Sequence, residues 1–279
     1  MNRTTAALLV LLTAMLLCGR ASSQTALDEA KKHIGAQQYQ QAIRLLLADR
    51  ERARQNQGVA ELDNLVGWSY FSLGMTREAE DYLNSAFINA EKEQNPEVKR
   101  LAANNLGILY FVEDNFDKSL FFFNNPAVRD TRTANQYRNL IADKRKEVEA
   151  ERLTQAGITA RFEQKFTKAI EFYDKALEML PNDSRILEFK GYALYRLGKY
   201  GEAVVVLRQA YRADIGRNRS LLPLNLIKAY CAIGKDQQVL AIINSAQVST
   251  TTLKLWWQQD KELQSVCAQS PALRQALNP

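Results

Sequence analysis

Small and aromatic residues recur at one fixed interval in the second half of this 279-residue chain. Four pairs of positions lie 34 residues apart: Gly157 and Gly191, Phe166 and Tyr200, Ala169 and Ala203, and Ala176 and Ala210. One spacing shared by four independent positions indicates a repeated structural unit. Two antiparallel helices approach to about 8–10 Å only where the crossing residues are small, which explains the glycines and alanines. The pattern therefore predicts an all-α chain of helical hairpins.

Other stretches carry the same marks less regularly. They are a degenerate unit over residues 27–49, a clearer unit around Gly67, a third around Gly107 and a divergent unit over residues 222–247. In the third unit, Ser119 takes the place of the first crossing alanine, and Pro126 predicts that the second helix ends early. One hairpin cannot bury its apolar face alone, so the units are expected to stack into a curved solenoid.

These marks resemble the tetratricopeptide repeat, which has a small residue early in its first helix, an aromatic residue after the turn, two crossing alanines and a final proline, here Pro181. The resemblance implies about five to six repeats. Repeats 1–3 would occupy residues 24–126, a connecting helix 127–151, repeats 4–6 residues 152–250, and a C-terminal helical cap 251–279. We expect the connecting helix to run into the next repeat, and Trp256 and Trp257 to pack beneath the cap.

The first residues are typical of a secretory signal. Arg3 supplies a positive charge, an apolar run follows from Ala6 to Leu17, and small residues precede Gln24. The run is shorter than the roughly 20 residues of a membrane-spanning helix. Cleavage after Ser23 and export, to the bacterial periplasm by resemblance, are the expectation. A retained anchor and lipidation of Cys18 are the alternatives, although Leu17 is larger than the residue that usually precedes a lipidated cysteine.

Cys231 and Cys267 remain once the leader is removed. Export would permit a disulfide between them. Two small packed thiols are the commoner arrangement for cysteines within helices, and we expect that arrangement here.

Charge and chemistry exclude several classes of function. The net charge of +6 falls to +4 without Arg3 and Arg20 of the leader, which is too small a surplus to predict nucleic-acid binding. The single histidine, His33, has no positioned nucleophile near it in the sequence and is expected to be packed or hydrogen-bonded. The sequence contains no phosphate loop and no zinc-ligand spacing, so we expect no enzymatic activity, metal, cofactor or small-molecule substrate.

The candidate site is the concave surface that the resemblance implies. Its partner-binding positions are assigned by counting each small glycine as position 8 of its repeat. They are Asn64, Trp68, Phe71, Asn104, Ile108, Phe111, Arg161, Tyr192, Tyr195 and Arg196. An amide such as Asn64 can donate to and accept from the backbone of an extended peptide, and aromatic side chains offer contact area at low entropic cost.

This surface predicts a non-enzymatic scaffold or adaptor that binds a peptide or protein partner. The alternatives are a structural subunit of an envelope or secretion assembly, and an accessory subunit of an enzyme. A clamp for the C-terminal carboxylate of a chaperone is disfavoured, because Trp68 and Ile108 stand where such a clamp has polar residues. Trp68 and Phe111 would not be available to a partner if the connecting helix covered them.

Overall fold

The computed structural model describes residues 25–53, 58–214 and 221–278. All regular secondary structure in these ranges is helical, which confirms the prediction of an all-α hairpin solenoid. The predicted signal segment, residues 1–23, and Cys18 lie outside the described residues. The chain divides into two compact units, and the boundary falls between Ala142 and Asp143.

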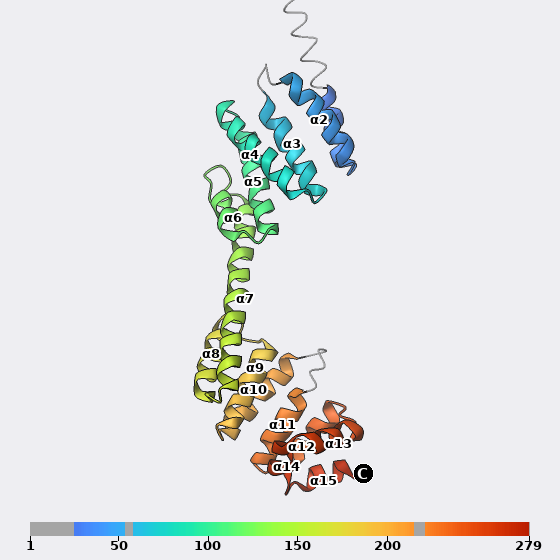
Figure 1. Ribbon diagram of the computed structural model, residues 1–279, viewed down its shortest axis with the longest axis vertical. Helices are drawn as coiled ribbons and strands as arrows, with labels where there is room; N and C mark the ends of the chain where they lie inside the picture. Colours follow the sequence, from blue (N-terminus) through green and yellow to red (C-terminus); the bar gives the residue numbers. More distant parts are fainter. Residues whose placement is uncertain (1–24, 54–57, 215–220, 279) are drawn as a thin grey trace, which may run out of the picture. The chain divides into compact units, whose positions relative to one another are not determined.

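The first unit consists of helical hairpins that follow one another along the chain (Figure 1). Its helices are residues 25–35, α2 (Tyr39–Ala53), α3 (Val59–Ser72), α4 (Thr76–Lys92), α5 (Pro96–Val112), α6 (Phe116–Phe123) and the beginning of α7 (Arg132–Phe162). Asn95 and Asn115 cap α5 and α6, because each side chain accepts a hydrogen bond from a backbone N–H of the first turn.

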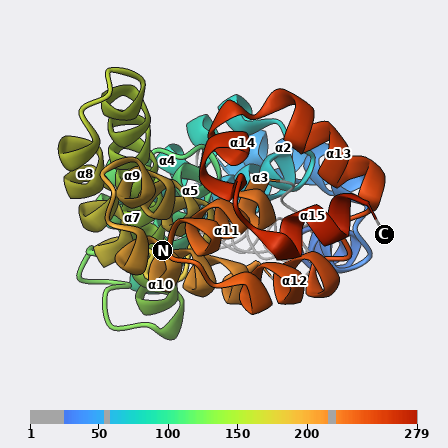
Figure 2. The same cartoon turned by 90° about the horizontal axis from the view of Figure 1, so that it is seen from below.

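The second unit continues the hairpins and ends in three short helices. It contains the end of α7, then α8 (Phe166–Met179), α9 (Ser184–Arg196), α10 (Tyr200–Ala213), α11 (Leu221–Ala232), α12 (Asp236–Ser245), α13 (Thr250–Gln259), α14 (Lys261–Cys267) and α15 (Pro271–Leu277). Asp183 caps α9, because its side chain accepts hydrogen bonds from the backbone N–H groups of Arg185 and Ile186. Helices α13 to α15, called the cap below, lie beside α11 and α12 in both views (Figures 1 and 2).

The turns inside the hairpins share one backbone conformation. Six such turns in the described ranges each place one residue in the left-handed region, with φ between 55° and 77°. These residues are Gln37, Gly74, Asp114, Gln164, Gly198 and Gly234. Glycine adopts this conformation without steric cost, which explains its use at three of the six turns. The described chain therefore contains six hairpins, within the predicted five to six.

The crossing positions are as close as the sequence predicts. Four glycines of the first helices each pack against a side chain sixteen positions later, on the second helix of the same hairpin. The pairs are Gly67 with Leu83, Gly107 with Phe123, Gly157 with Tyr173, and Gly191 with Leu207. The crossing alanines Ala169, Ala176, Ala203 and Ala210 are fully buried.

The third repeat and the connecting helix also follow the expectation. Helix α6 ends at Phe123, ahead of Pro126, and the buried Ser119 donates its hydroxyl hydrogen bond to the Gly107 carbonyl at 2.8 Å. Helix α7 is continuous, so the connecting helix does run into the first helix of the fourth repeat. Residues 142–148 of α7 are all exposed.

The cap buries leucines in the same core as α11 and α12. Leu253, Leu263 and Leu273 are each at most 1% exposed there. Trp256 and Trp257 are half-buried against this core, as expected for residues that pack beneath a cap. His33 is hydrogen-bonded through Nδ1 to Gln38, at 2.6 Å, in agreement with the expectation of a packed or hydrogen-bonded side chain.

Candidate functional site

The second unit contains a pocket of about 480 Å³ on the inner side of its first helices. The described residues that line it are Arg161 and Phe162 of α7, Gln164, Phe166 of α8, Glu188, Phe189, Tyr192 and Arg196 of α9, Leu221, Leu224, Asn225 and Lys228 of α11, and Asp260. The side chains come from three successive hairpins and the cap. Their shared face follows from the repeat, because equivalent positions of successive first helices point to the same side.

The cationic side chains of this pocket lie over aromatic rings. Tyr192 has three cationic groups over its ring: Lys228 Nζ at 5.3 Å, and the guanidinium carbons of Arg161 and Arg196 at 5.7 and 5.9 Å from the ring centroid. Arg196 also lies 4.8 Å from the Phe166 centroid. Such contacts attract a cation to the electron-rich ring face and fix the direction of a long side chain.

Two of the three cations are neutralised within the protein. Lys228 is only 4% exposed, and its ammonium group donates to Asp260 at 3.0 Å and to Glu262 at 3.1 Å. Arg196 forms an ion pair with the same Glu262 at 3.2 Å. A buried ammonium needs such partners, because an unpaired charge away from water is costly.

Arg161 differs from its two neighbours. Its guanidinium carbon lies 5.2 Å from the ring centroids of both Phe162 and Phe189, and no described residue forms an ion pair with it. Guanidinium stays charged at any physiological pH and offers five N–H donors in a planar fork that suits a carboxylate. Among the described residues, the pocket therefore presents one partly exposed cation without an ion-pair partner, and an acidic group from outside can reach it.

Two buried tyrosines near the pocket, Tyr195 and Tyr173, have raised pKa values. Burial raises the pKa of Tyr195 well above its ordinary value of 10.0, and burial raises the pKa of Tyr173 to about 12. Neither phenol can therefore serve as a base near neutral pH. Within the described ranges, no group of three or more histidine, cysteine or acidic side chains could hold a metal ion.

Three of the predicted site residues line the pocket, namely Arg161, Tyr192 and Arg196. Tyr195 does not, because it is 9% exposed and packs against the Tyr200 ring at 5.5 Å. The expectation that Tyr195 offers contact area to a partner is corrected accordingly. The phenol belongs to the core of the repeat.

The remaining predicted residues lie in the first unit. Trp68 and Phe71 are half-buried and contact each other, with ring centroids 5.4 Å apart. Phe111 packs edge-on against Tyr137 of α7 at 5.0 Å, so the start of the connecting helix partly covers it. Asn104 and Ile108 are also partly exposed.

Asn64 requires a correction. Its side chain is 5% exposed, and its amide oxygen accepts a hydrogen bond from Asn105 Nδ2 at 3.0 Å. The amide therefore joins α3 to α5 inside the unit and is not displayed for an extended peptide.

Sequence reasoning missed Lys228 and Asp260. With Ile227 counted as the small position of the sixth repeat, Lys228 takes the position next to it, which is also the position of Tyr192 in the fifth repeat. That register was a usable signal. Asp260 follows α13 in the non-repeating cap, where no register applies.

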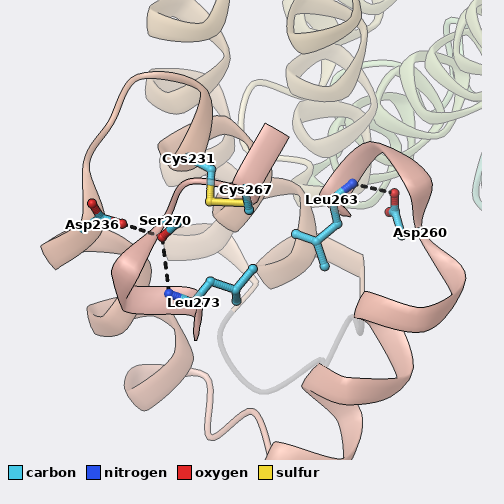
Figure 3. Close-up of a disulfide and its surroundings, with 7 residues drawn as sticks. All are labelled: Cys231, Asp236, Asp260, Leu263, Cys267, Ser270 and Leu273. Carbon is cyan, nitrogen blue, oxygen red and sulfur yellow. Dashed lines mark hydrogen bonds between the residues drawn. A yellow bond between two sulfur atoms is a disulfide. The ribbon is translucent and has the colours of Figure 1, made fainter. Parts of the chain in front are cut away.

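The cysteines also differ from the expectation. Cys231 of α11 and Cys267 of α14 form a disulfide, with their Cα atoms 5.1 Å apart, instead of two packed thiols (Figure 3). That Cα separation is ordinary for a disulfide. The bond connects α11, which lines the pocket, to α14, which follows directly after the pocket residue Asp260.

The successive helical hairpins place the fold in the class of helical-hairpin repeat proteins. Residues 150–183 and 184–214 match the tetratricopeptide repeat. The match covers α8 to α10 and the last part of α7. The second unit therefore contains two tetratricopeptide repeats. The fold is that of a protein–protein interaction scaffold, and repeats of this kind are generally non-enzymatic.

Solved structures of similar fold share little sequence with the chain. The TPR2AB domain of yeast Sti1 in its pHSP90 complex is 15% identical, with a TM-score of 0.44, and the match covers 92% of this chain and 97% of that one. The P58(IPK) TPR domain is 18% identical, with a TM-score of 0.37 and coverages of 91% and 66%. A tetratricopeptide repeat protein from Parabacteroides merdae is 15% identical, with a TM-score of 0.34 and coverages of 92% and 98%.

No curated protein matches the chain. Among the helices that the structure describes, none combines the length and the apolar character needed to cross a bilayer.

Proposed function

We propose that this protein is an adaptor whose second unit binds a segment of a partner protein in the pocket described above. The observation that carries the proposal is Arg161, a pocket-lining guanidinium that has no ion-pair partner among the described residues. An acidic side chain or terminal carboxylate of the partner would pair with it. Hydrogen bonds to a guanidinium fork from a carboxylate are among the stronger ones in proteins.

Apolar side chains beside Arg161 favour a mixed acidic and aromatic segment. Phe162 is 76% exposed and Leu221 is 57% exposed, and both line the pocket. Large exposed apolar side chains at a concave site gain free energy when a partner covers them. The volume suits one or two side chains of an extended segment.

An exported location, with the periplasm as the compartment, is part of the proposal. The signal-like sequence of residues 1–23 supports it. The Cys231–Cys267 disulfide supports it independently, because disulfides persist in oxidising compartments and are rare in the cytosol.

The test uses two designed probes and fluorescence polarisation. The first probe is a fluorescein-labelled heptapeptide of alternating Asp and Phe, and the second replaces each Asp by Asn. We expect the acidic probe to bind more tightly, and Arg161→Gln to weaken its binding about tenfold or more, which corresponds to one charge-assisted hydrogen-bonded pair. The neutral probe should be affected little.

Arg208→Gln is the matched control. Arg208 is exposed on α10 outside the pocket lining, so its replacement removes the same charge from another face. Equal weakening by both variants would mean that the probe senses only net charge, and the pocket would lose its assigned role. If neither variant changes the probe affinity and the protein also self-associates, the assembly-subunit alternative would be favoured.

A further inference from the structure

The disulfide joins the two helices that carry the opposite charges of the pocket cluster. Lys228 lies three positions before Cys231 on α11, and Glu262 lies five positions before Cys267 on α14. In Figure 3 the bond spans α11 and α14, and Asp260 accepts a hydrogen bond from the Leu263 backbone N–H at 2.9 Å. The bond therefore holds Asp260 and Glu262 of the cap beside Lys228 of α11.

The cap contributes acidic groups to the pocket but few of its lining residues. Of the described residues that line the pocket, only Asp260 belongs to the cap segment. Together with Glu262, it supplies the carboxylates that Lys228 and Arg196 contact. Displacing the cap acids would leave most of the enclosure in place and would free two further cations.

The cap is too short to hold its position without its attachments. Its helices have ten, seven and seven residues, well below the length at which an isolated helix is stable in water. Four kinds of attachment hold it: the buried leucines, the contact of Ser270 with Asp236, the ion pairs of Asp260 and Glu262 with Lys228 and Arg196, and the disulfide. Figure 3 shows the disulfide and the Ser270–Asp236 contact. Terminal elements of a solenoid open locally more easily than its centre, so loss of the covalent attachment lowers the cost of opening here.

We propose that Asp260 and Glu262 act as an internal acidic competitor for the partner's acidic segment, and that the disulfide keeps this competitor in place. While the bond is intact, the two carboxylates are confined next to Lys228 and Arg196 at a high effective concentration. Among the described cations of the oxidised pocket, only Arg161 is then available to pair with a partner. After reduction, a partner with several acidic groups displaces the cap acids and gains two cations. This inference rests on the proposed function of the pocket.

The redox step is ordinary thiol–disulfide exchange. A thiolate of an external dithiol attacks one sulfur, the Cys231–Cys267 bond breaks, and the second thiolate of the dithiol resolves the mixed disulfide. The protein gains two electrons and two protons as two thiols, and the dithiol becomes a cyclic disulfide. The reverse reaction needs a small-molecule disulfide as the electron acceptor.

The experiment compares the two redox states of one protein, so that no pocket residue needs to be changed. Cys18→Ala removes the remaining cysteine, and thiol titration in denaturant verifies each state. Polarisation with the Asp/Phe heptapeptide measures affinity before and after treatment with dithiothreitol. We expect reduction to tighten binding about tenfold or more. The variant Cys231→Ser/Cys267→Ser should bind like the reduced protein and should not respond to the reductant.

A second measurement tests whether the cap is displaced. Hydrogen exchange of the reduced protein should rise in α13–α15 when the probe binds, while exchange in α9 and α10 stays unchanged. In Asp260→Asn/Glu262→Gln, tight binding should no longer depend on the redox state, and circular dichroism checks that this variant is folded.

Equal or weaker binding after reduction of the folded protein would overturn the inference. If the oxidised protein still discriminates between probes through Arg161, the proposed function survives that result. If the probe binds to neither state, the proposed function fails and the competitor has nothing to compete with.

Discussion

Gly157 provides a direct test of the repeat packing beneath the pocket. A methyl group at this position would lie 2.8 Å from Tyr173 Cδ1 and 2.9 Å from its Cζ, and closer still to Cε1. Tyr173 is fully buried and contacts the Phe189 ring at a centroid distance of 5.9 Å, so its ring has no open space to enter. The variant Gly157→Ala therefore has to displace backbone or a buried ring.

Two opposing effects set the size of the change. Extra methylene-sized groups in a packed core cost about 1–3 kcal/mol. Alanine is favoured over glycine inside a helix by about 1 kcal/mol. Because the methyl group would meet three ring atoms of a side chain that cannot move away, we expect the clash to dominate. The free energy of unfolding of the second unit should fall by about 1–2 kcal/mol.

Urea denaturation in a Trp68→Phe background measures this unit alone. The remaining tryptophans, Trp256 and Trp257, both lie in α13. Gly201→Ala is the control, since this glycine is exposed on α10 and a methyl group there meets no heavy atom within 4 Å. The control should gain up to about 1 kcal/mol from helix propensity. The same gain in Gly157→Ala would refute the close crossing of α7 and α8.

Two further predictions concern polar groups inside the repeats. The Tyr173 hydroxyl is buried and has no hydrogen-bond partner within the described ranges. The variant Tyr173→Phe should therefore raise the free energy of unfolding by about 1 kcal/mol in the same urea assay. A lower free energy of unfolding would reveal a partner for the hydroxyl. Hydrogen bonds from Tyr110 and from Lys118 lower the pKa of Glu80 below its ordinary value of 4.5. The ionised Glu80 side chain therefore stabilises the folded state above pH 4.5, and this stabilisation is lost as the pH falls through the folded-state pKa. The stability difference between the parent and Glu80→Gln should therefore shrink between about pH 5 and pH 3, and a pH-independent difference in thermal midpoints would contradict the assignment.

Much of the fold could be predicted because the repeat is local. Each glycine and its packing partner lie sixteen residues apart on consecutive helices, so the sequence spacing reports the contact directly. The early end of α6 before Pro126 follows from proline chemistry alone. Only distances along a single hairpin were needed for these inferences.

The site could be predicted only where the register continues. Arg161, Tyr192 and Arg196 were found because they occupy inner positions of regular repeats. Asp260 and the Cys231–Cys267 bond were not, since the disulfide joins residues 36 positions apart and depends on how a non-repeating cap docks. No periodicity in the sequence reports such docking.

Asn64 shows a different limit of reasoning from a register. Its position is an inner one, but its amide is satisfied by Asn105, 41 residues further on. The pairing depends on which neighbour the adjacent first helix presents, and that choice is not visible in one repeat. An inner position in the repeat therefore predicts which side of the helix a side chain is on, but not whether that side chain is available to a partner.

Availability decides which unit offers polar recognition. The inner residues of the first unit include an amide that is already bonded, at Asn64, and aromatic pairs such as Trp68 with Phe71. In the second unit, the equivalent face has Arg161, a permanently charged donor with no acidic partner among the described residues. A buried hydrogen-bonded amide has little left to offer, whereas a guanidinium over aromatic rings keeps its donor fork for an acid. For this reason an acidic partner segment should select the second unit.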